Sequence, residues 1–280
     1  AGCLYLTLTG GEPLCRPDFE DILAHAVRLG LAVSVFTNGS RVDERAADFM
    51  AAHPPRRVEI SLYGDGRESY AAVTGAGCNF DLALAGLDRL LARGVAVRLK
   101  ALLLRPLLAR ADGMRALARQ RGLSLRLDPC VDPALDGGRG PCALRPDPDE
   151  AVRVELADPD ARALLEHALD GEDRSGPCGA GYRSFHLDPS GMLMRCLMVR
   201  TPACPAAVVG FDDAWRRLGE AGRVVLGQAP ACRDCPDRNL CSMCPGLERI
   251  GERPGPGSHT CRVARARGAV LRRQRDEVAA

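Results

Sequence analysis

The cysteines between positions 178 and 261 are the residues whose spacing most directly indicates chemistry. A Cys-x12-Gly-x4-Cys segment is followed by a Cys-x2-Cys-x5-Cys-x2-Cys segment and by one last cysteine. The seven positions are Cys178, Cys196, Cys232, Cys235, Cys241, Cys244 and Cys261. Thiols at such close spacing form disulfides, bind zinc or ligate iron–sulfur clusters. The choice among these three decides which function the sequence supports.

A disulfide framework fits this chain poorly. Such frameworks are typical of small secreted domains, whereas this chain has 280 residues, an odd total of 13 cysteines and no basic segment before its first apolar run. Zinc is the stronger competitor, although only five residues separate the two Cys-x2-Cys pairs. Seven thiolates exceed the needs of one tetrahedral zinc ion. They come close to the roughly eight ligands of two four-iron clusters, so the spacing favours iron–sulfur clusters over zinc.

This cysteine pattern resembles the SPASM domain, the C-terminal extension of many radical S-adenosylmethionine (SAM) enzymes. All seven cysteines and Gly191 match, and the one departure is that two residues instead of three separate Cys241 from Cys244. The resemblance implies two auxiliary [4Fe–4S] clusters. The first would be ligated by Cys178, Cys196 and Cys244, and the second by Cys232, Cys235, Cys241 and Cys261. Cys204, Cys142 or an open iron would complete the first cluster.

Composition and charge exclude several other classes of function. The formal net charge is only +2, which gives no reason to expect a nucleic-acid or anionic-membrane partner. No apolar stretch is long enough to span a bilayer. Many unpaired thiols without an export signal indicate a reducing, cytoplasmic location.

The first half of the chain alternates between apolar strands and amphipathic helices. The expected strands are 4–8, 32–36, 57–62, 95–104 and 123–127, and the expected helices are 17–29, 43–52, 80–93 and 110–121. Regular alternation predicts a parallel α/β sheet, either open and doubly wound or part of a β/α barrel. In both, ligands bind at the carboxyl ends of the strands.

Those strand ends carry short motifs that resemble the radical SAM core, a partial (β/α)6 barrel. Gly10-Gly11-Glu12-Pro13 follows the first strand, Thr37-Asn38-Gly39 follows the second, and Ser61 ends the third. The resemblance assigns SAM contacts to Gly10, Gly11, Glu12, Pro13, Thr37, Asn38, Ser61 and Lys100. For Lys100, which lies midway along an apolar strand, an ion pair at the strand end is an equal alternative.

One family motif has no counterpart here. The family's first strand is followed by Cys-x3-Cys-x2-Cys, which holds the SAM-cleaving cluster, and that spacing occurs nowhere in this sequence. By the order of its motifs the chain is expected to begin at the second barrel strand. We therefore expect a fragment of a larger enzyme that does not cleave SAM by itself.

The expected organisation is a truncated radical SAM core at 1–128, a linker at 129–177 and a SPASM domain at 178–280. The linker is rich in Pro, Gly and Asp and is interpreted as solvated, with one polar helix at 160–169. A β-hairpin is expected around the Asp188–Gly191 turn, followed by a short strand at 208–211 and a helix at 214–218. The Arg-rich tail, 262–280, is expected to be a solvated helix.

The function implied by this resemblance is modification of a peptide or protein substrate, as in ribosomal peptide natural product maturation. A 5′-deoxyadenosyl radical formed from SAM would abstract a hydrogen atom, with flavodoxin or ferredoxin as electron donor. No catalytic residue is assigned. Sulfatase maturation is disfavoured, because Leu197 stands where those enzymes carry an Asp. The alternative is a non-catalytic iron–sulfur or zinc module that binds peptides.

Overall fold

The structure, a computed structural model, describes residues 2–171, 178–220, 232, 234–253 and 255–279. The chain divides into two compact units, Ala1–Pro129 and Cys130–Ala280. Each unit is described separately below.

The first unit contains a sheet of five parallel strands in the sequential order β1-β2-β3-β4-β5. The strands are β1 (Tyr5–Leu8), β2 (Ala32–Thr37), β3 (Arg57–Ser61), β4 (Val97–Leu102) and β5 (Leu125–Asp128). All five were expected from the sequence. Because the strand order contains no reversal, the sheet has the connectivity of a β/α barrel and not that of a doubly wound sheet.

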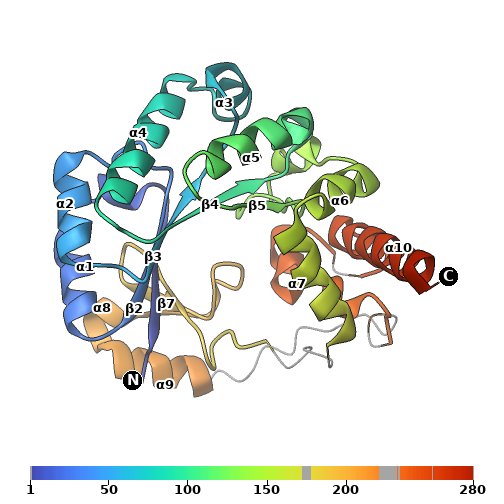
Figure 1. The fold of residues 1–280 in the computed structure, drawn as a ribbon. Coiled ribbons are helices and arrows are strands. Elements are labelled where there is room, and N and C mark those ends of the chain that lie inside the picture. The colour runs from blue at the N-terminus through green and yellow to red at the C-terminus, as the bar shows by residue number, and fades with distance from the viewer. Residues whose placement is uncertain (1, 172–177, 221–231, 233, 254, 280) are drawn as a thin grey trace. The chain divides into compact units, whose positions relative to one another are not determined.

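Helices connect successive strands and lie outside the sheet (Figure 1). They are α1 (Phe19–Arg28), α2 (Glu44–Ala52), α3 (Arg67–Thr74), α4 (Cys78–Ala92) and α5 (Ala111–Arg119), with short 3-10 segments at Pro13–Cys15 and Arg105–Arg110. Local sequence explains where α2 begins, because the Asp43 side chain accepts a hydrogen bond from Ala46 N at 2.8 Å. The short helix α3 is an addition to the four helices expected.

The sheet has one apolar face, and this face forms the core of the unit. Its side chains are at most 3% exposed: Val33, Val35, Val58, Ile60, Leu99 and Leu125. The helices cover it with Leu23, Leu87, Leu90 and Met114, which are at most 1% exposed. Successive side chains of a strand point to opposite faces, so the remaining strand residues lie on the other side.

That other face is polar. The register aligns Phe36 of β2 with Glu59 of β3, and Glu59 with Arg98 of β4. The next row toward the carboxyl ends aligns Ser61, Lys100 and Arg126.

Helix α4 approaches the turn after β2 at two glycines. Gly39 has a φ of 78°, a conformation that L side chains rarely adopt. Gly86 lies so close to this turn that a Cβ at position 86 would overlap the Gly39 carbonyl oxygen. The absence of a side chain at Gly86 therefore lets α4 hold the turn after β2.

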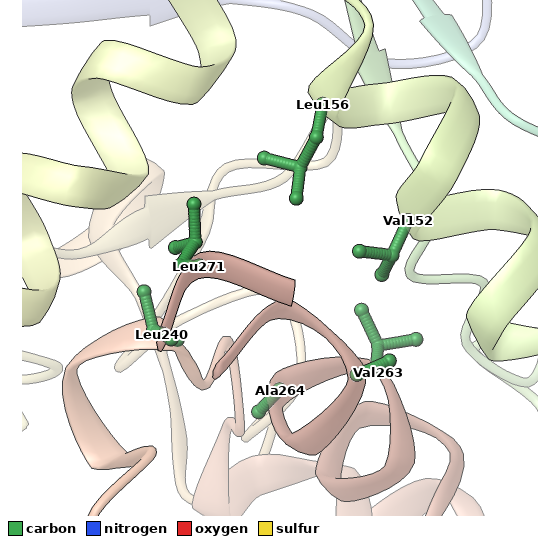
Figure 2. Close-up of a cluster of buried hydrophobic side chains, with 7 residues drawn as sticks. Val152, Leu156, Leu240, Val263, Ala264 and Leu271 are labelled. Carbon is green, nitrogen blue, oxygen red and sulfur yellow. The ribbon is translucent and has the colours of Figure 1, made fainter. Parts of the chain in front are cut away.

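The second unit is built around α6 (Pro148–Leu156), α7 (Pro159–Asp170) and α10 (His259–Ala279). Figure 2 shows its core, in which side chains of α6 and α10 meet together with Leu240. The cluster consists of Val152, Leu156, Leu240, Val263, Ala264, Ala266 and Leu271.

Two expectations for this unit need correction. Residues 148–156, expected within a solvated linker, form helix α6, which packs on α10, whereas the helix expected at 160–169 is present as α7. The tail from 262 onward is helical as expected, but one side of it is buried. Val263, Ala266 and Leu271 recur at helical spacing and form that buried stripe, which the many arginines of the segment obscure.

A buried ion pair fixes α10 against α6. Arg267 Nε and one terminal nitrogen donate to the two Glu155 oxygens at 2.8 and 2.7 Å, and the other terminal nitrogen donates to the Leu240 carbonyl at 2.9 Å. Both side chains are 7% exposed. Because Leu240 precedes Cys241, this contact also anchors the cysteine-bearing segment.

A small three-stranded sheet forms the other part of this unit. The expected hairpin is present: β6 (His186–Leu187) and β7 (Met192–Met194) pair antiparallel, and β8 (Ala203–Pro205) adds to β7. Residues 208 and 209 of the expected strand instead lie in helix α8 (Ala206–Val209). Helix α9 (Phe211–Glu220) follows it and contains residues 214–218, which were expected to be helical. None of the helices in the described ranges has the length and apolar character needed to cross a bilayer.

We predict that Gly86→Ala lowers the stability of the first unit. Alanine favours a helix over glycine by about 1 kcal/mol, but overlap with the Gly39 carbonyl should reverse this gain and cost about 1–3 kcal/mol. Urea unfolding followed by circular dichroism measures the change. Gly219→Ala, at an exposed position of α9 where a Cβ meets no atom within 4 Å, is the matched control and should stabilise. A gain in stability for both variants would contradict the contact.

Candidate functional site

The turn after β1 exposes its backbone. Gly10 has a φ of 145°, a conformation that favours glycine. A Cβ added at Gly10 or at Gly11 would meet no atom within 4 Å. This turn therefore offers open space at the carboxyl edge of the sheet, where a ligand can approach the main chain.

The Glu12 carboxylate joins this turn to the turn after β2. Its Oε1 accepts hydrogen bonds from Thr37 Oγ1 at 2.7 Å and from Leu14 N at 3.2 Å. Its Oε2 accepts one from Asn38 N at 2.8 Å. Pro13 is buried next to it. Glu12 thus positions the two turns relative to each other.

The turn after β2 is also held by its own side chains. Thr37 Oγ1 accepts from Gly39 N at 3.0 Å, and Asn38 Oδ1 accepts from Ser40 N at 2.8 Å and from Ser40 Oγ at 2.6 Å. The side chains of Thr37 and Asn38, which the sequence analysis assigned to SAM, therefore also stabilise this turn.

Ser61 and Lys100 lie side by side on the polar face of the sheet. Lys100 Nζ is 3.4 Å from Glu59 Oε2 and 3.1 Å from the centre of the Phe36 ring. Burial lowers the pKa of Lys100, and the nearby Glu59 carboxylate opposes this shift. Of the two roles considered for Lys100, the ion pair is the one present in the structure.

In the second unit, the cysteines border a common cavity of about 440 Å³. Six of the seven candidate ligands line it: Cys178, Cys232, Cys235, Cys241, Cys244 and Cys261. Asp237 and Asn239 line it too, and no motif in the sequence pointed to these two residues. The turns between the cysteines are short 3-10 segments, Arg238–Leu240 and Pro245–Ile250.

The thiols fall into two electrostatic groups. Burial raises the pKa of Cys241, and the nearby thiols Cys261, Cys232 and Cys235 raise it further, against a backbone hydrogen bond at Met243. Burial likewise raises the pKa of Cys232, with Cys261 and Cys235 adding to the shift.

The second group lies around Cys244. Burial raises its pKa first, and the thiols that raise it further are Cys196 and Cys178. Cys196 is held locally, since its Sγ accepts a hydrogen bond from Val199 N at 3.2 Å. Four thiols therefore interact around Cys232, and three around Cys244.

The two further cysteines considered for the three-thiol group lie elsewhere in the second unit. Cys204 is on β8, where it faces Leu193 and packs against an apolar cluster that includes Phe185 and Trp215. Cys142 lies in a 3-10 turn, Pro141–Leu144. Neither is among the groups that shift the pKa of Cys244.

The arrangement of the cysteine thiols can be compared with the coordination that a zinc ion or an iron–sulfur cluster requires. Among the described residues, no three Cys, His, Asp or Glu side chains converge on a point that could hold a single ion. A zinc ion needs four donors within about 2.3 Å, whereas these thiols surround a cavity. A set of soft thiol donors around a space larger than one ion fits an iron–sulfur cluster better.

Known proteins place the chain in a family. Residues 1–106 match the model of the radical SAM superfamily. The chain is 30% identical over 257 residues to the mycofactocin maturase MftC of Mycobacterium tuberculosis, and 30% over 258 residues to that of Mycobacterium ulcerans. It is 27% identical over 255 residues to the PqqA peptide cyclase of Streptomyces rochei. Each alignment covers 85% of this chain.

Solved structures share the fold. Streptococcus suis SuiB bound to S-adenosylmethionine aligns over 85% of this chain and 60% of its own, with a TM-score of 0.64 and 14% identity. The protein anSMEcpe with bound AdoMet aligns over 100% of this chain and 85% of its own, with a TM-score of 0.72 and 15% identity. These similarities confirm the α/β fold expected from the strand-end motifs.

The alignments differ in how much of each relative they cover. The chain spans 64% of the M. tuberculosis protein, 68% of the M. ulcerans protein and 70% of the S. rochei protein. With the matching superfamily model and the parallel α/β sheet, these alignments establish that the chain belongs to the radical SAM superfamily.

Proposed function

We propose that this chain is the SAM-binding and auxiliary-cluster part of an enzyme that modifies a peptide. The observation that carries the proposal is the cavity of about 440 Å³ that six of the seven thiols line, with the thiols acting on one another as a group of four and a group of three. One metal ion does not need seven thiols, whereas two clusters do.

The two groups suggest how the clusters are held. Cys232, Cys235, Cys241 and Cys261 would ligate one cluster, and Cys178, Cys196 and Cys244 the other. Both sets are those implied by the SPASM pattern. The raised thiol pKa values favour the same view, because iron neutralises thiolates that burial and mutual repulsion otherwise oppose.

The first unit would bind SAM at the carboxyl edge of its sheet. Gly10 and Gly11 leave the backbone open there, and Ser61 ends a strand of the same sheet. Glu12 would act by holding the turns after β1 and β2 in place. The chemistry that bound SAM supplies on reduction is hydrogen abstraction by a 5′-deoxyadenosyl radical; the chain's own residues orient the reactants and exclude water.

A peptide substrate is supported by the names of the relatives. MftC is a maturase, the PqqA cyclase acts on a peptide, and SuiB has been solved with its precursor peptide SuiA. An external electron donor such as flavodoxin or ferredoxin would reduce the clusters. The proposed enzyme is therefore an oxidoreductase that takes part in the maturation of a peptide.

Iron content is the first test. Anaerobic reconstitution with iron and sulfide should give about eight irons per chain, with thiolate-to-iron absorbance. Cys244→Ala should lower the iron content by roughly half, because it removes a ligand of one cluster only. Cys204→Ala, in the apolar cluster, is the control and should keep all the iron. Stoichiometric zinc without iron uptake would overturn the proposal.

SAM affinity is the second test. Gly11→Val should weaken binding by roughly tenfold or more, because a Cβ at this position meets no atom within 4 Å and the branched side chain would project into the open space at the turn. Ser61→Ala removes one hydrogen bond, about 0.5–1.5 kcal/mol or up to about tenfold. Titration calorimetry measures both, and circular dichroism checks folding. Wild-type affinity in a folded Gly11→Val variant would remove the turn after β1 from the SAM site.

A further inference from the structure

The polar face of the five-stranded sheet is unusual for a parallel sheet. Parallel sheets are ordinarily covered on both faces, and their strands are hydrophobic throughout. Here β3 and β5 instead alternate between buried apolar residues and more exposed polar ones, and β4 does so from Val97 to Ala101, before the exposed Leu102. The polar side chains of these strands therefore face water or a polar ligand.

One half of the charges on this face lies around Glu59, with two cations for one carboxylate. Glu59, with a side chain only 14% exposed, lies 2.7 Å from Arg57 Nε through its Oε1 and 3.4 Å from Lys100 Nζ through its Oε2. Its two oxygens are thus shared by two cations.

The other half carries an excess of positive charge. Arg98 is exposed and has no hydrogen-bond or ion-pair partner among the residues that the structure describes. Arg126, one strand over and with a side chain 80% exposed, lies 3.7 Å from Asp128. The face as a whole carries four cations, Arg57 included, against two carboxylates. Two guanidinium groups on neighbouring strands, with only the long Arg126–Asp128 contact between them and a net charge of +2 on the face, favour binding of an anion.

This basic pair is separate from the edge assigned above to SAM. Apart from Lys100 on β4, the residues assigned there follow β1 or lie at the ends of β2 and β3, whereas Arg98 and Arg126 are on β4 and β5. Neighbouring strands are about 4.8 Å apart, so β5 lies roughly 10 Å from β3. Arg98 also lies one row nearer the amino ends of the strands than Ser61.

We propose that Arg98 and Arg126 form a carboxylate subsite that binds an Asp or Glu side chain of the peptide substrate. The inference rests on the proposed function, since it places the peptide on the same sheet face as SAM. It assigns the substrate to the class of acidic peptides, and it makes the two arginines specificity-determining residues.

The experiment uses the anaerobically reconstituted chain with SAM present. Two decapeptides that differ only in two adjacent Glu or Gln residues carry a neutral fluorophore and blocked termini, and anisotropy gives their affinities at low salt. The Glu peptide should bind about three- to tenfold more tightly. Arg98→Gln with Arg126→Gln should abolish the difference. Arg110→Gln with Arg119→Gln, an equal loss of two positive charges at exposed positions at either end of α5, should leave it unchanged.

Three outcomes would overturn the subsite. The first is equal affinity of the wild-type protein for the two peptides, and the second is a preference for Glu that survives in the double variant. The third is that a Gln peptide with an unblocked, free terminal carboxylate binds with the preference expected of the Glu peptide. The double variant should keep its SAM affinity; a loss there without a change in peptide affinity would reassign the arginines to SAM. Normal iron uptake and SAM affinity alongside a failed peptide test would leave the proposed function intact.

Discussion

Thiols crowded into a partly buried cavity resist ionisation, because burial disfavours the thiolate and each thiolate repels the next. In the second unit, Cys232, Cys241 and Cys244 all have raised pKa values for these reasons. A bound metal cluster reverses this balance, since iron stabilises the deprotonated ligands. The unit otherwise relies on two modest apolar clusters. On this account, cluster binding and folding of the second unit are coupled, and the Arg267–Glu155 pair anchors the cysteine-bearing segment to the helical part.

The five-stranded sheet of the first unit has to meet two requirements. It must form a hydrophobic core, and it must keep polar groups accessible to ligands. It does so by using one face for the core and one for chemistry. The apolar face packs against helices, and α4 approaches closely enough at Gly86 to hold the turn after β2. The Glu12 carboxylate then fixes that turn to the one after β1. The open glycines and the charged strand positions can therefore be held rigidly while they remain accessible.

Sequence reasoning succeeded where the pattern was local. Alternation along the strands, the Asp43 cap and the hairpin turn before Gly191 each depend on residues close together in the chain. It failed where packing between distant segments decides. Arg267 and Glu155 are 112 residues apart, so the partner that allows Arg267 to be buried cannot be read from the local sequence. The alternation of apolar and polar residues in β3 and β4 indicates that the sheet has a polar face. Only the strand register shows which charged side chains on it are neighbours.

The central claim is that the thiols of the second unit form two separate clusters, and Mössbauer spectroscopy of protein reconstituted with enriched iron tests it most directly. Cys178→Ala and Cys235→Ala each remove one ligand, from the group of three and from the group of four. The account predicts that each variant loses or alters a different half of the wild-type spectrum and keeps the other half. Loss of the same iron signal in both variants, or a spectrum with one kind of cluster that both substitutions abolish, would contradict it.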